Sequence, residues 1–289
     1  MEKHSNRILI IGATGNVGRA LVDRLSRAGH GAAIRALARR PDTADLPEGV
    51  EVVAGDLMDL DSLAAALEGV DRVFLMWPLG NGEQAAPILA LLAARVRRVV
   101  YLSTIGVRDD DTDAPDPILQ FHTYIEKAIR ATPLEWTFVR SGGMASNTRG
   151  WAAEIRESSE VSWVYGDAGR ALVHEADLAE IAEIALLTDR LVGAAPQITG
   201  ASVTTQRQQA ALIGDAIGRP VSWQEVRPEA IRERLIGYGW PRETAEGALR
   251  AWAGIVDSPE VPTGDFADIT GHPARDFAHW AADHAEDFR

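Results

Sequence analysis

Short apolar segments alternate with amphipathic segments through the first half of the chain. Each apolar segment has the length and the β-branched or aromatic content that is typical of a buried β-strand. The predicted strands are Arg7–Ile11, Ala32–Ala38, Val50–Ala54, Arg72–Met76, Val99–Ser103 and Trp136–Val139.

The segments between these strands carry helical signals. Apolar residues in Val17–Ala28 recur at i, i+3 and i+4 up to Gly29, which predicts an amphipathic helix that ends at this glycine. Asp61 is the predicted N-cap of a short helix over Ser62–Leu67. Strands that alternate with helices in this way predict an α/β fold with a doubly wound parallel sheet, covered on both faces.

The pattern changes after Arg140, where a loop rich in Gly, Ser and Asn precedes mostly helical segments. We therefore expect a dinucleotide-binding-type domain over residues 1–150, completed by later strands, and a smaller, mainly helical C-terminal region over residues 151–289. The acidic stretch Asp109–Asp113 is predicted to be a solvated loop. The predicted C-terminal helices are Leu178–Leu187, Thr205–Ile217, Glu229–Tyr238, Arg242–Ile255 and Ala274–Phe288.

Charge and composition limit the classes of partner. The chain has 289 residues, no cysteine and a formal net charge of −13, which repels phosphate backbones and anionic lipid. Neither nucleic acid nor a membrane is expected as a partner, and the uncharged run Gln84–Ala94 is about half of the ~20 residues that a bilayer crossing needs. Without cysteine or an apolar leader, the sequence is predicted to be cytoplasmic.

A glycine-rich turn follows the first predicted strand and opens the first predicted helix. Glycines permit a tight turn and a close approach of backbone N–H groups to a pyrophosphate, and the helix N-terminus adds partial positive charge. The spacing is GxxGxxG, and a strand before it and a helix after it make a dinucleotide site the expected function. The predicted cofactor contacts in this turn are Gly12, Thr14, Gly15, Asn16, Val17 and Gly18.

Two arginines follow the second predicted strand. At this position a carboxylate would bind the adenine ribose hydroxyls of NAD(H), whereas a guanidinium suits a 2′-phosphate. Arg39 is the first choice for that contact and Arg40 the second. The sequence therefore predicts NADP(H) in preference to NAD(H); ordinary surface charge is the alternative for both arginines.

The ends of the third and fourth predicted strands carry further candidates. Asp56 and Leu57 are placed to contact the adenine edge, while helix capping is the alternative for Asp56. Trp77 and Pro78 form a bulky turn at the carboxyl end of the sheet, where ligands bind in doubly wound folds. They are expected to line the nicotinamide pocket, or else to pack beneath the C-terminal region.

Several of these segments together resemble the atypical short-chain dehydrogenase/reductase superfamily, and within it the NmrA-like proteins. The resemblance covers nearly the whole chain and implies a Rossmann-like fold that binds NAD(P). Members of this superfamily often form dimers, so a homodimer is one expected assembly. The matching segments are Gly12–Gly18, Arg35–Arg39, Gly55–Leu57, the helix beginning at His122, Trp136–Arg140 and Ile269–Pro273.

The chain departs from that superfamily at the catalytic helix. Its enzymes usually carry Tyr-x-x-x-Lys after the fifth strand, and here His122 and Glu126 occupy these positions. Four residues turn a helix only about 40° beyond one turn, so both side chains share a face. Glu126 would orient His122 and favour its charged form, and His122 would donate a proton during hydride transfer. Alternatively, the two residues shape a pocket without chemistry.

The end of the fifth predicted strand supplies two hydroxyl groups. Ser103 and Thr104 are expected to bind a substrate carbonyl or the nicotinamide ribose, with a strand-terminal turn as the alternative. Asp177 is predicted to cap the helix that follows it. No metal site is expected. The predicted substrate pocket contains Trp77, His122, Gly142, Met144, Asn147 and His174.

These observations predict an NADPH-dependent oxidoreductase that transfers hydride to a small conjugated or aromatic carbonyl, such as a quinone, enone or ketone. The substrate class follows from the resemblance and from the tryptophan in the cleft. Because Tyr-x-x-x-Lys is missing, the alternative is a non-catalytic NAD(P)(H)-binding redox sensor of the NmrA type, which would bind a protein partner. An isomerase or epimerase is a third option, and it would consume no NADPH.

Overall fold

The computed structural model describes residues 6–27, 29, 31–78, 82–108 and 117–289. Within this part the chain divides into two compact units, each with its own core. The first unit contains Met1–Ser141 and Glu175–Ile198, and the second contains Gly142–His174 and Thr199–Arg289. The acidic stretch Asp109–Asp113 lies outside the described residues.

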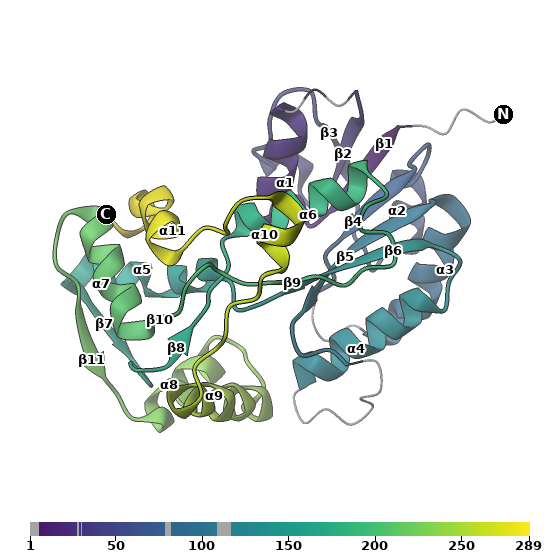
Figure 1. Ribbon diagram of the computed structural model, residues 1–289. Helices are drawn as coiled ribbons and strands as arrows, with labels where there is room; N and C mark the ends of the chain where they lie inside the picture. Colours follow the sequence, from purple (N-terminus) through teal and green to yellow (C-terminus); the bar gives the residue numbers. More distant parts are fainter. Residues whose placement is uncertain (1–5, 28, 30, 79–81, 109–116) are drawn as a thin grey trace. The chain divides into compact units, whose positions relative to one another are not determined.

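A parallel sheet forms the centre of the first unit (Figure 1). Its strand order, β3-β2-β1-β4-β5-β6-β9, reverses between β1 and β4, and every pairing is parallel. This is the doubly wound, Rossmann-like arrangement that the sequence predicts. The strands are β1 (Arg7–Ile11), β2 (Ala33–Ala38), β3 (Glu51–Ala54), β4 (Arg72–Leu75), β5 (Arg98–Thr104), β6 (Glu135–Ser141) and β9 (Gln197–Ile198).

Helices cover both faces of this sheet. Figure 1 shows α1 and α6 on one face and α2, α3 and α4 on the other. The second face carries a continuous core in which strand residues such as Leu9, Leu75 and Phe138 pack with Leu63, Ile88 and Ile125 of the helices. The helices are α1 (Asn16–Arg27), α2 (Leu60–Ala66), α3 (Ala85–Arg95), α4 (Pro117–Arg130) and α6 (Glu175–Leu187).

Two predicted helices begin earlier than expected, α2 by two residues and α6 by three. Helix α2 begins at Leu60 because Asp59, and not Asp61, accepts the amide protons of Asp61 and Ser62. Helix α6 begins at Glu175, so Asp177 lies in its first turn and is fully buried instead of capping it. In both cases several acidic residues stand close together in the sequence, and only the local backbone decides where among them the helix begins.

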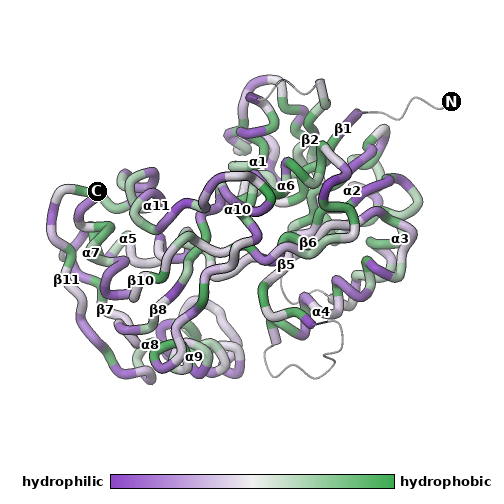
Figure 2. Tube along the Cα trace, in the orientation of Figure 1, coloured by the Kyte–Doolittle hydropathy of each residue, from purple (hydrophilic) through white to green (hydrophobic). Residues whose placement is uncertain are grey.

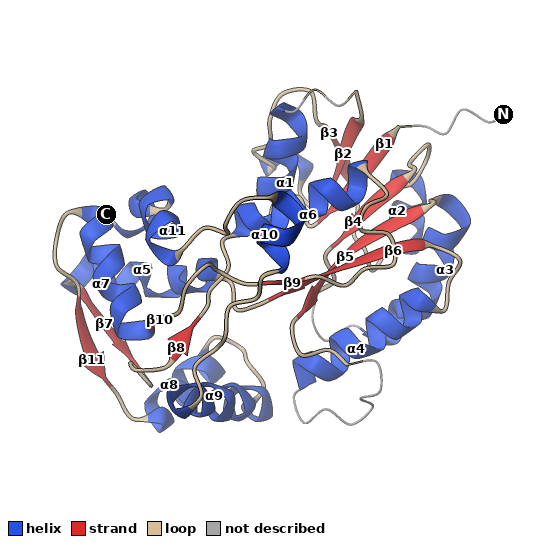
Figure 3. Cartoon of the chain, viewed as in Figure 1, coloured by secondary structure: helices blue, strands red, loops and turns tan. Residues whose placement is uncertain are grey.

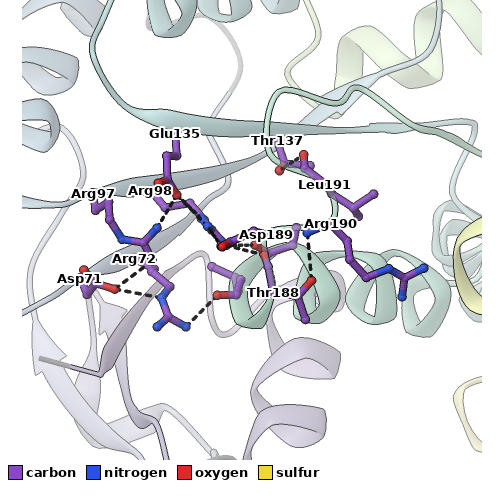
Figure 4. A network of polar contacts seen from close by, with 12 residues as sticks. Asp71, Arg72, Arg97, Arg98, Glu135, Thr137, Thr188, Asp189, Arg190 and Leu191 are labelled. Carbon is purple, nitrogen blue, oxygen red and sulfur yellow. Dashed lines mark hydrogen bonds and ion pairs between the residues drawn. The ribbon is translucent and has the colours of Figure 1, made fainter. Parts of the chain in front are cut away.

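Ion pairs connect the starts of three neighbouring strands (Figure 4). The buried Arg98 bonds Glu135 at 2.7 Å, donates to the Ala185 carbonyl at 2.9 Å and also pairs with Asp189. Arg97 pairs with Glu135 as well. This network occupies the amino edge of the sheet and connects it to the end of α6. The opposite, carboxyl edge is therefore the one left for a ligand.

The second unit combines helices with two short two-stranded sheets (Figure 3). An antiparallel pair joins β8 to β10, and a parallel pair joins β7 to β11. Its helices are α5 (Ala152–Ser158), α7 (Gln206–Ile217), α8 (Pro228–Gly237), α9 (Arg242–Asp257), α10 (Asp265–Thr270) and α11 (Phe277–Asp283). Its strands are β7 (Glu160–Trp163), β8 (Gly169–Arg170), β10 (Thr204–Thr205) and β11 (Ser222–Glu225).

The predicted terminal helix Ala274–Phe288 was too long. Asp276 caps the helix by accepting the amide proton of His279, so α11 begins only at Phe277. The chain then continues from Ala285 as a short 3-10 helix. The other predicted C-terminal helices exist with small shifts at their ends, whereas the positions of the short strands, α5 and α10 were not predicted. Such short elements carry too few residues for a periodic pattern.

Candidate active site

The glycine turn after β1 has the backbone geometry that a phosphate-binding turn needs. Gly12 has φ +86°, in the left-handed region, and its carbonyl accepts the amide proton of Gly15 at 3.0 Å. A Cβ on Gly18 would lie 2.1 Å from the carbonyl oxygen of Gly12, so only glycine fits there. A Cβ on Gly15 would meet that oxygen at 3.3 Å. The three glycines therefore set a tight turn that leads directly into α1.

The start of α1 fits an anionic ligand. The first turn of the helix contains no acidic residue, and the helix is long enough for its N-terminus to carry partial positive charge. Thr14 and Asn16 are exposed on this turn, whereas Val17 is buried and anchors the helix in the core. The turn thus offers backbone N–H groups and small polar side chains, which are the groups that hold a dinucleotide pyrophosphate.

The predicted adenine-side residues lie at the ends of β2 and β3. Arg39 and Arg40 directly follow β2, and both side chains are exposed. The amide of Gly55 donates to the carbonyl of Ala38, which holds the two strand ends together. Two positive charges thus lie at the edge where a 2′-phosphate would be bound, and the residues fit that group.

Asp56 and Leu57 have distinct local roles. The Asp56 carboxylate accepts the amide proton of Met58 at 2.9 Å, which forms a turn, and Asp59 rather than Asp56 caps α2. The capping alternative for Asp56 is therefore wrong. Leu57 is buried in the core of the first unit. Contact of either residue with an adenine ring remains a prediction.

Trp77 lies two residues after the carboxyl end of β4. The side chain is only 4% exposed and packs in the core of the first unit, while Pro78 is exposed. Its indole Nε1 is buried and has no hydrogen-bond partner among the described residues. Met76, one residue earlier, lies against Gly12, where a Cβ would meet its methyl carbon at 2.6 Å. The end of β4 therefore packs directly beneath the glycine turn.

Two hydrogen-bonded pairs connect β5 to α4. The hydroxyl of Tyr101 lies 2.7 Å from Nδ1 of His122, and the hydroxyl of Ser103 donates to Oε1 of Glu126 at 2.6 Å. Residues two apart on a strand are separated by about 6.6 Å and residues four apart on a helix by about 6 Å, so the two pairs can form side by side. The structure thus brings the predicted residues His122, Glu126 and Ser103 to one place.

Glu126 is a fully buried carboxylate with several donors. Besides the bond from Ser103, it accepts two hydrogen bonds from Arg140, at 3.0 and 2.7 Å, and lies 3.4 Å from Arg130. Both carboxylate oxygens are thus engaged by arginine, which compensates the cost of burying the charge. The buried carboxylate of Glu126 is therefore held by Arg140 and Arg130.

Tyr101 is the residue that the sequence analysis missed. It is fully buried on β5, packs edge-to-face on Phe138 and bonds His122. Burial raises the pKa of Tyr101 well above its usual value, and the negative charge of Glu126 raises it further. The sequence did carry a signal for Tyr101: it lies two residues before Ser103 on the same strand, and residues two apart share a face of the strand.

Helix α4 has a buried side and an exposed side, and its mixture of hydrophobic and hydrophilic residues can be followed in Figure 2. Tyr124 is 49% exposed, on the side away from the buried Glu126, while His122 is partly exposed. Thr104, at the end of β5, is partly exposed and its hydroxyl lies 3.5 Å from the Ser141 carbonyl. Of the two hydroxyls predicted at this strand end, Ser103 is buried and engaged by Glu126.

The other predicted pocket residues belong to the second unit. Met144 forms a parallel bridge to Val173, which brings it beside the segment of His174. His174 is buried, and its Nε2 lies 3.3 Å from the Asp283 carboxylate. Gly142 is partly exposed and Asn147 is exposed, with the Asn147 amide bonded to the carbonyl of Met144. Their contact with a substrate remains a prediction.

The described part of the chain has neither a metal-binding cluster nor a membrane-spanning helix. It contains no group of three or more His, Cys, Asp or Glu residues that could hold a metal ion. No helix within the described ranges is long and apolar enough to span a bilayer.

Comparison with known proteins identifies the family of this chain. Residues 12–186 match the model of the family described as NAD(P)H-binding, which covers more than half of the chain and includes the glycine turn, β5 and α4. The chain belongs to this NAD(P)H-binding family. The expected nicotinamide cofactor and the Rossmann-like resemblance are thereby confirmed.

Two relatives of this NAD(P)H-binding protein are named as reductases. It is 39% identical to (4-alkanoyl-5-oxo-2,5-dihydrofuran-3-yl)methyl phosphate reductase of Streptomyces griseus, with 97% of this chain and 99% of the relative covered. It is 31% identical to the NAD(P)H azoreductase of Xenophilus azovorans, with the same coverage of both chains. The expected NAD(P)H-dependent oxidoreductase is supported over the sensor alternative.

A solved structure shares the fold. An NADPH-dependent quinone oxidoreductase from Escherichia coli, determined with NADPH, matches this NAD(P)H-binding protein with a TM-score of 0.77 and 23% identity. The match covers 96% of this chain and 99% of the other. The similarity extends over both units and confirms the predicted α/β fold.

Proposed function

We propose that this protein is an NADPH-dependent reductase of small conjugated or aromatic carbonyl compounds of the quinone or enone type. One observation carries the proposal: the glycine turn lies where the strand order reverses, and His122 is held at β5, two strands away on the same sheet. Ligands of doubly wound sheets bind in this crevice at the carboxyl ends of the strands. A partly exposed imidazole there can act on a bound carbonyl.

Residues along the carboxyl edge of the sheet would hold the cofactor, whose reduced nicotinamide supplies a hydride when bound. The Gly12–Gly18 turn would hold the pyrophosphate, and Arg39 and Arg40 the 2′-phosphate, which favours NADPH over NADH. Asp56 and Leu57 would border the adenine. The residues proposed at the nicotinamide end are Trp77, Pro78, Ser103 and Thr104.

His122 is the proposed catalytic residue. It would interact with the substrate oxygen, on which negative charge develops as hydride reaches the substrate. Glu126 and Ser103 act less directly, because they bond each other and Arg140 and so fix the face of α4 that carries His122. Gly142, Met144, Asn147 and His174 are proposed to line the substrate side.

The substrate class is supported by the relatives. The relative from Streptomyces griseus is named for a dihydrofuranone methyl phosphate that carries an alkanoyl group, and the structural relative is named for quinones. Each substrate combines a carbonyl group with a ring. A small ring-containing carbonyl compound is therefore the proposed substrate, and a protein partner is not required.

The test is oxidation of NADPH by the purified protein with a panel of quinones, butenolides, enones and aromatic ketones, with NADPH binding measured in parallel. Substrate-dependent oxidation would establish the reductase. Tight binding without oxidation by any compound, together with different affinities for NADP⁺ and NADPH, would instead favour the redox sensor.

Two further expectations concern the cellular location and the oligomeric state of the protein. We infer that the protein acts in the cytoplasm, and that it forms a homodimer as related superfamily members often do. Light scattering of the purified protein at several concentrations tests the assembly, and a monomer at every concentration would contradict it.

A further inference from the structure

The hydrogen bond between Tyr101 and His122 restricts which nitrogen of the imidazole ring can carry a proton. The Tyr101 hydroxyl is fully buried, and among the described residues its only hydrogen-bond partner is Nδ1 of His122, at 2.7 Å. A phenol always has one hydrogen to donate, and a buried donor without an acceptor is costly. The acceptor available to this phenol is therefore Nδ1.

The phenol keeps its hydrogen in this site. Burial raises the pKa of Tyr101 and the charge of Glu126 adds to the effect, so the tyrosinate form is disfavoured. Nδ1 must then be unprotonated to accept, and the single proton of a neutral imidazole lies on Nε2. An imidazolium would place an N–H on Nδ1 against the phenol oxygen and leave the phenol hydrogen without its acceptor.

The charged groups near the pair support the neutral ring. Glu126, one helical turn beyond His122, has both oxygens bonded by Arg140 and Ser103 and a further contact with Arg130. Two arginines against one carboxylate leave an excess of positive charge in this region, which disfavours a further positive charge on His122.

We propose that Tyr101 is a positioning residue that holds His122 as the neutral tautomer with its proton on Nε2, so that His122 acts as a hydrogen-bond donor to the substrate carbonyl oxygen and not as an acid. This inference rests on the proposed function for its substrate. In the reduction, the substrate carbon gains a hydride with its electron pair from the reduced nicotinamide. The carbonyl π electrons move to oxygen, where Nε2–H stabilises the negative charge, and water supplies the proton that completes the product.

The direct test is NMR of the imidazole nitrogens in ¹⁵N-labelled protein without substrate, with the His122 signals among those of the seven histidines identified by their loss in His122→Gln. At neutral pH we expect a neutral ring protonated at Nε2. A ring protonated at Nδ1, or at both nitrogens, would overturn the proposal. Because no substrate is present, this result does not depend on whether a substrate is found.

The variant Tyr101→Phe removes the hydroxyl and keeps the edge-to-face packing on Phe138. We expect His122 to become a mixture of tautomers, kcat to fall about tenfold with little change in KM, and the pH profile of kcat to change shape. Tyr124→Phe, on the exposed side of the same helix, is the matched control and should change none of these. An unchanged tautomer in Tyr101→Phe would overturn the proposal; if that variant does not fold, the spectrum of the unmodified protein decides.

The two hypotheses fail in different ways. If no compound in the panel is reduced, the proposed function fails while the tautomer of His122 is still measured. If reduction is observed but His122 is an imidazolium in the free protein, the reductase stands and the role given to Tyr101 is wrong.

Discussion

Ser103 donates a 2.6 Å hydrogen bond to Glu126, and both side chains are buried. The hydroxyl at the end of β5 and the residue at the lysine position of α4 thus bind each other. Arg140 of β6 completes the group with two hydrogen bonds to the same carboxylate. Glu126, which the sequence suggested as the partner of His122, therefore binds Ser103 and Arg140. The ring of His122 instead bonds Tyr101 of the neighbouring strand.

Removal of the Glu126 carboxylate should destabilise the protein. In Glu126→Ala, Arg140 and Arg130 lose their shared partner inside the protein, which costs about 3–5 kcal/mol of unfolding free energy. Chemical denaturation followed by circular dichroism measures this loss. Glu157→Ala, at an exposed site, serves as the control and should change stability by less than about 0.5 kcal/mol. Equal stability of the two variants would show that the buried pairing contributes nothing.

Replacement of His122 should affect the chemical step and not cofactor binding. His122→Gln removes the imidazole, and we expect kcat to fall about a hundredfold, as when one donor to a developing oxyanion is lost. The dissociation constant for NADPH should remain the same, since the glycine turn and the arginines hold the cofactor. Turnover equal to that of the unmodified protein would eliminate His122 as the catalytic residue.

Gly18 should tolerate no side chain. In Gly18→Ala the new Cβ would lie 2.1 Å from the Gly12 carbonyl oxygen, so the turn must open. We expect a lower Tm and at least about a tenfold loss of NADPH affinity, measured by thermal unfolding and titration. Gly254→Ala, in open space within α9, is the matched control and should keep or raise the Tm. Normal NADPH affinity in Gly18→Ala would contradict the assignment of the turn.

Arg39 should determine the preference for NADPH. A charge-assisted hydrogen bond contributes about 1.5–3 kcal/mol, so Arg39→Ala should weaken NADPH binding by about 10- to 100-fold and leave NADH binding unchanged. Calorimetric titration with both cofactors measures the two affinities. Arg95→Ala, an exposed arginine at the end of α3, controls for the loss of charge. NADH binding as tight as NADPH binding in the unmodified protein would overturn the preference.

Glu135 should make stability depend on acid pH. Burial alone would raise the pKa of Glu135, but hydrogen bonds and charges from Arg98 and Arg97 outweigh it, and the pKa is lowered from 4.5. A carboxyl with a lowered folded-state pKa stabilises the fold fully above its unfolded-state value and loses this contribution as pH falls through the folded-state pKa. Unfolding should therefore become easier below about pH 4.5, and less steeply so in Glu135→Gln. Identical pH profiles for the two proteins would exclude this carboxyl as a contributor.

The sequence by itself determined the first unit closely. Alternation of buried apolar strands with amphipathic helices requires both faces of a parallel sheet to be covered, and the six predicted strands of this region all exist within two residues of their predicted ends. The turn formed by Gly12, Gly15 and Gly18 could be predicted because a backbone that leaves no room for a side chain requires glycine in the sequence.

Only the tertiary structure decided the partners of the buried polar groups. Tyr101 meets His122 and Ser103 meets Glu126 across more than twenty positions of chain, while Arg140 reaches Glu126 from a third element. Local spacing placed His122 and Glu126 on one helix face and so suggested that they interact. A helix face does not reveal which side chains its neighbouring strands present to it. Burial then requires each donor to find an acceptor among the residues that the fold brings there.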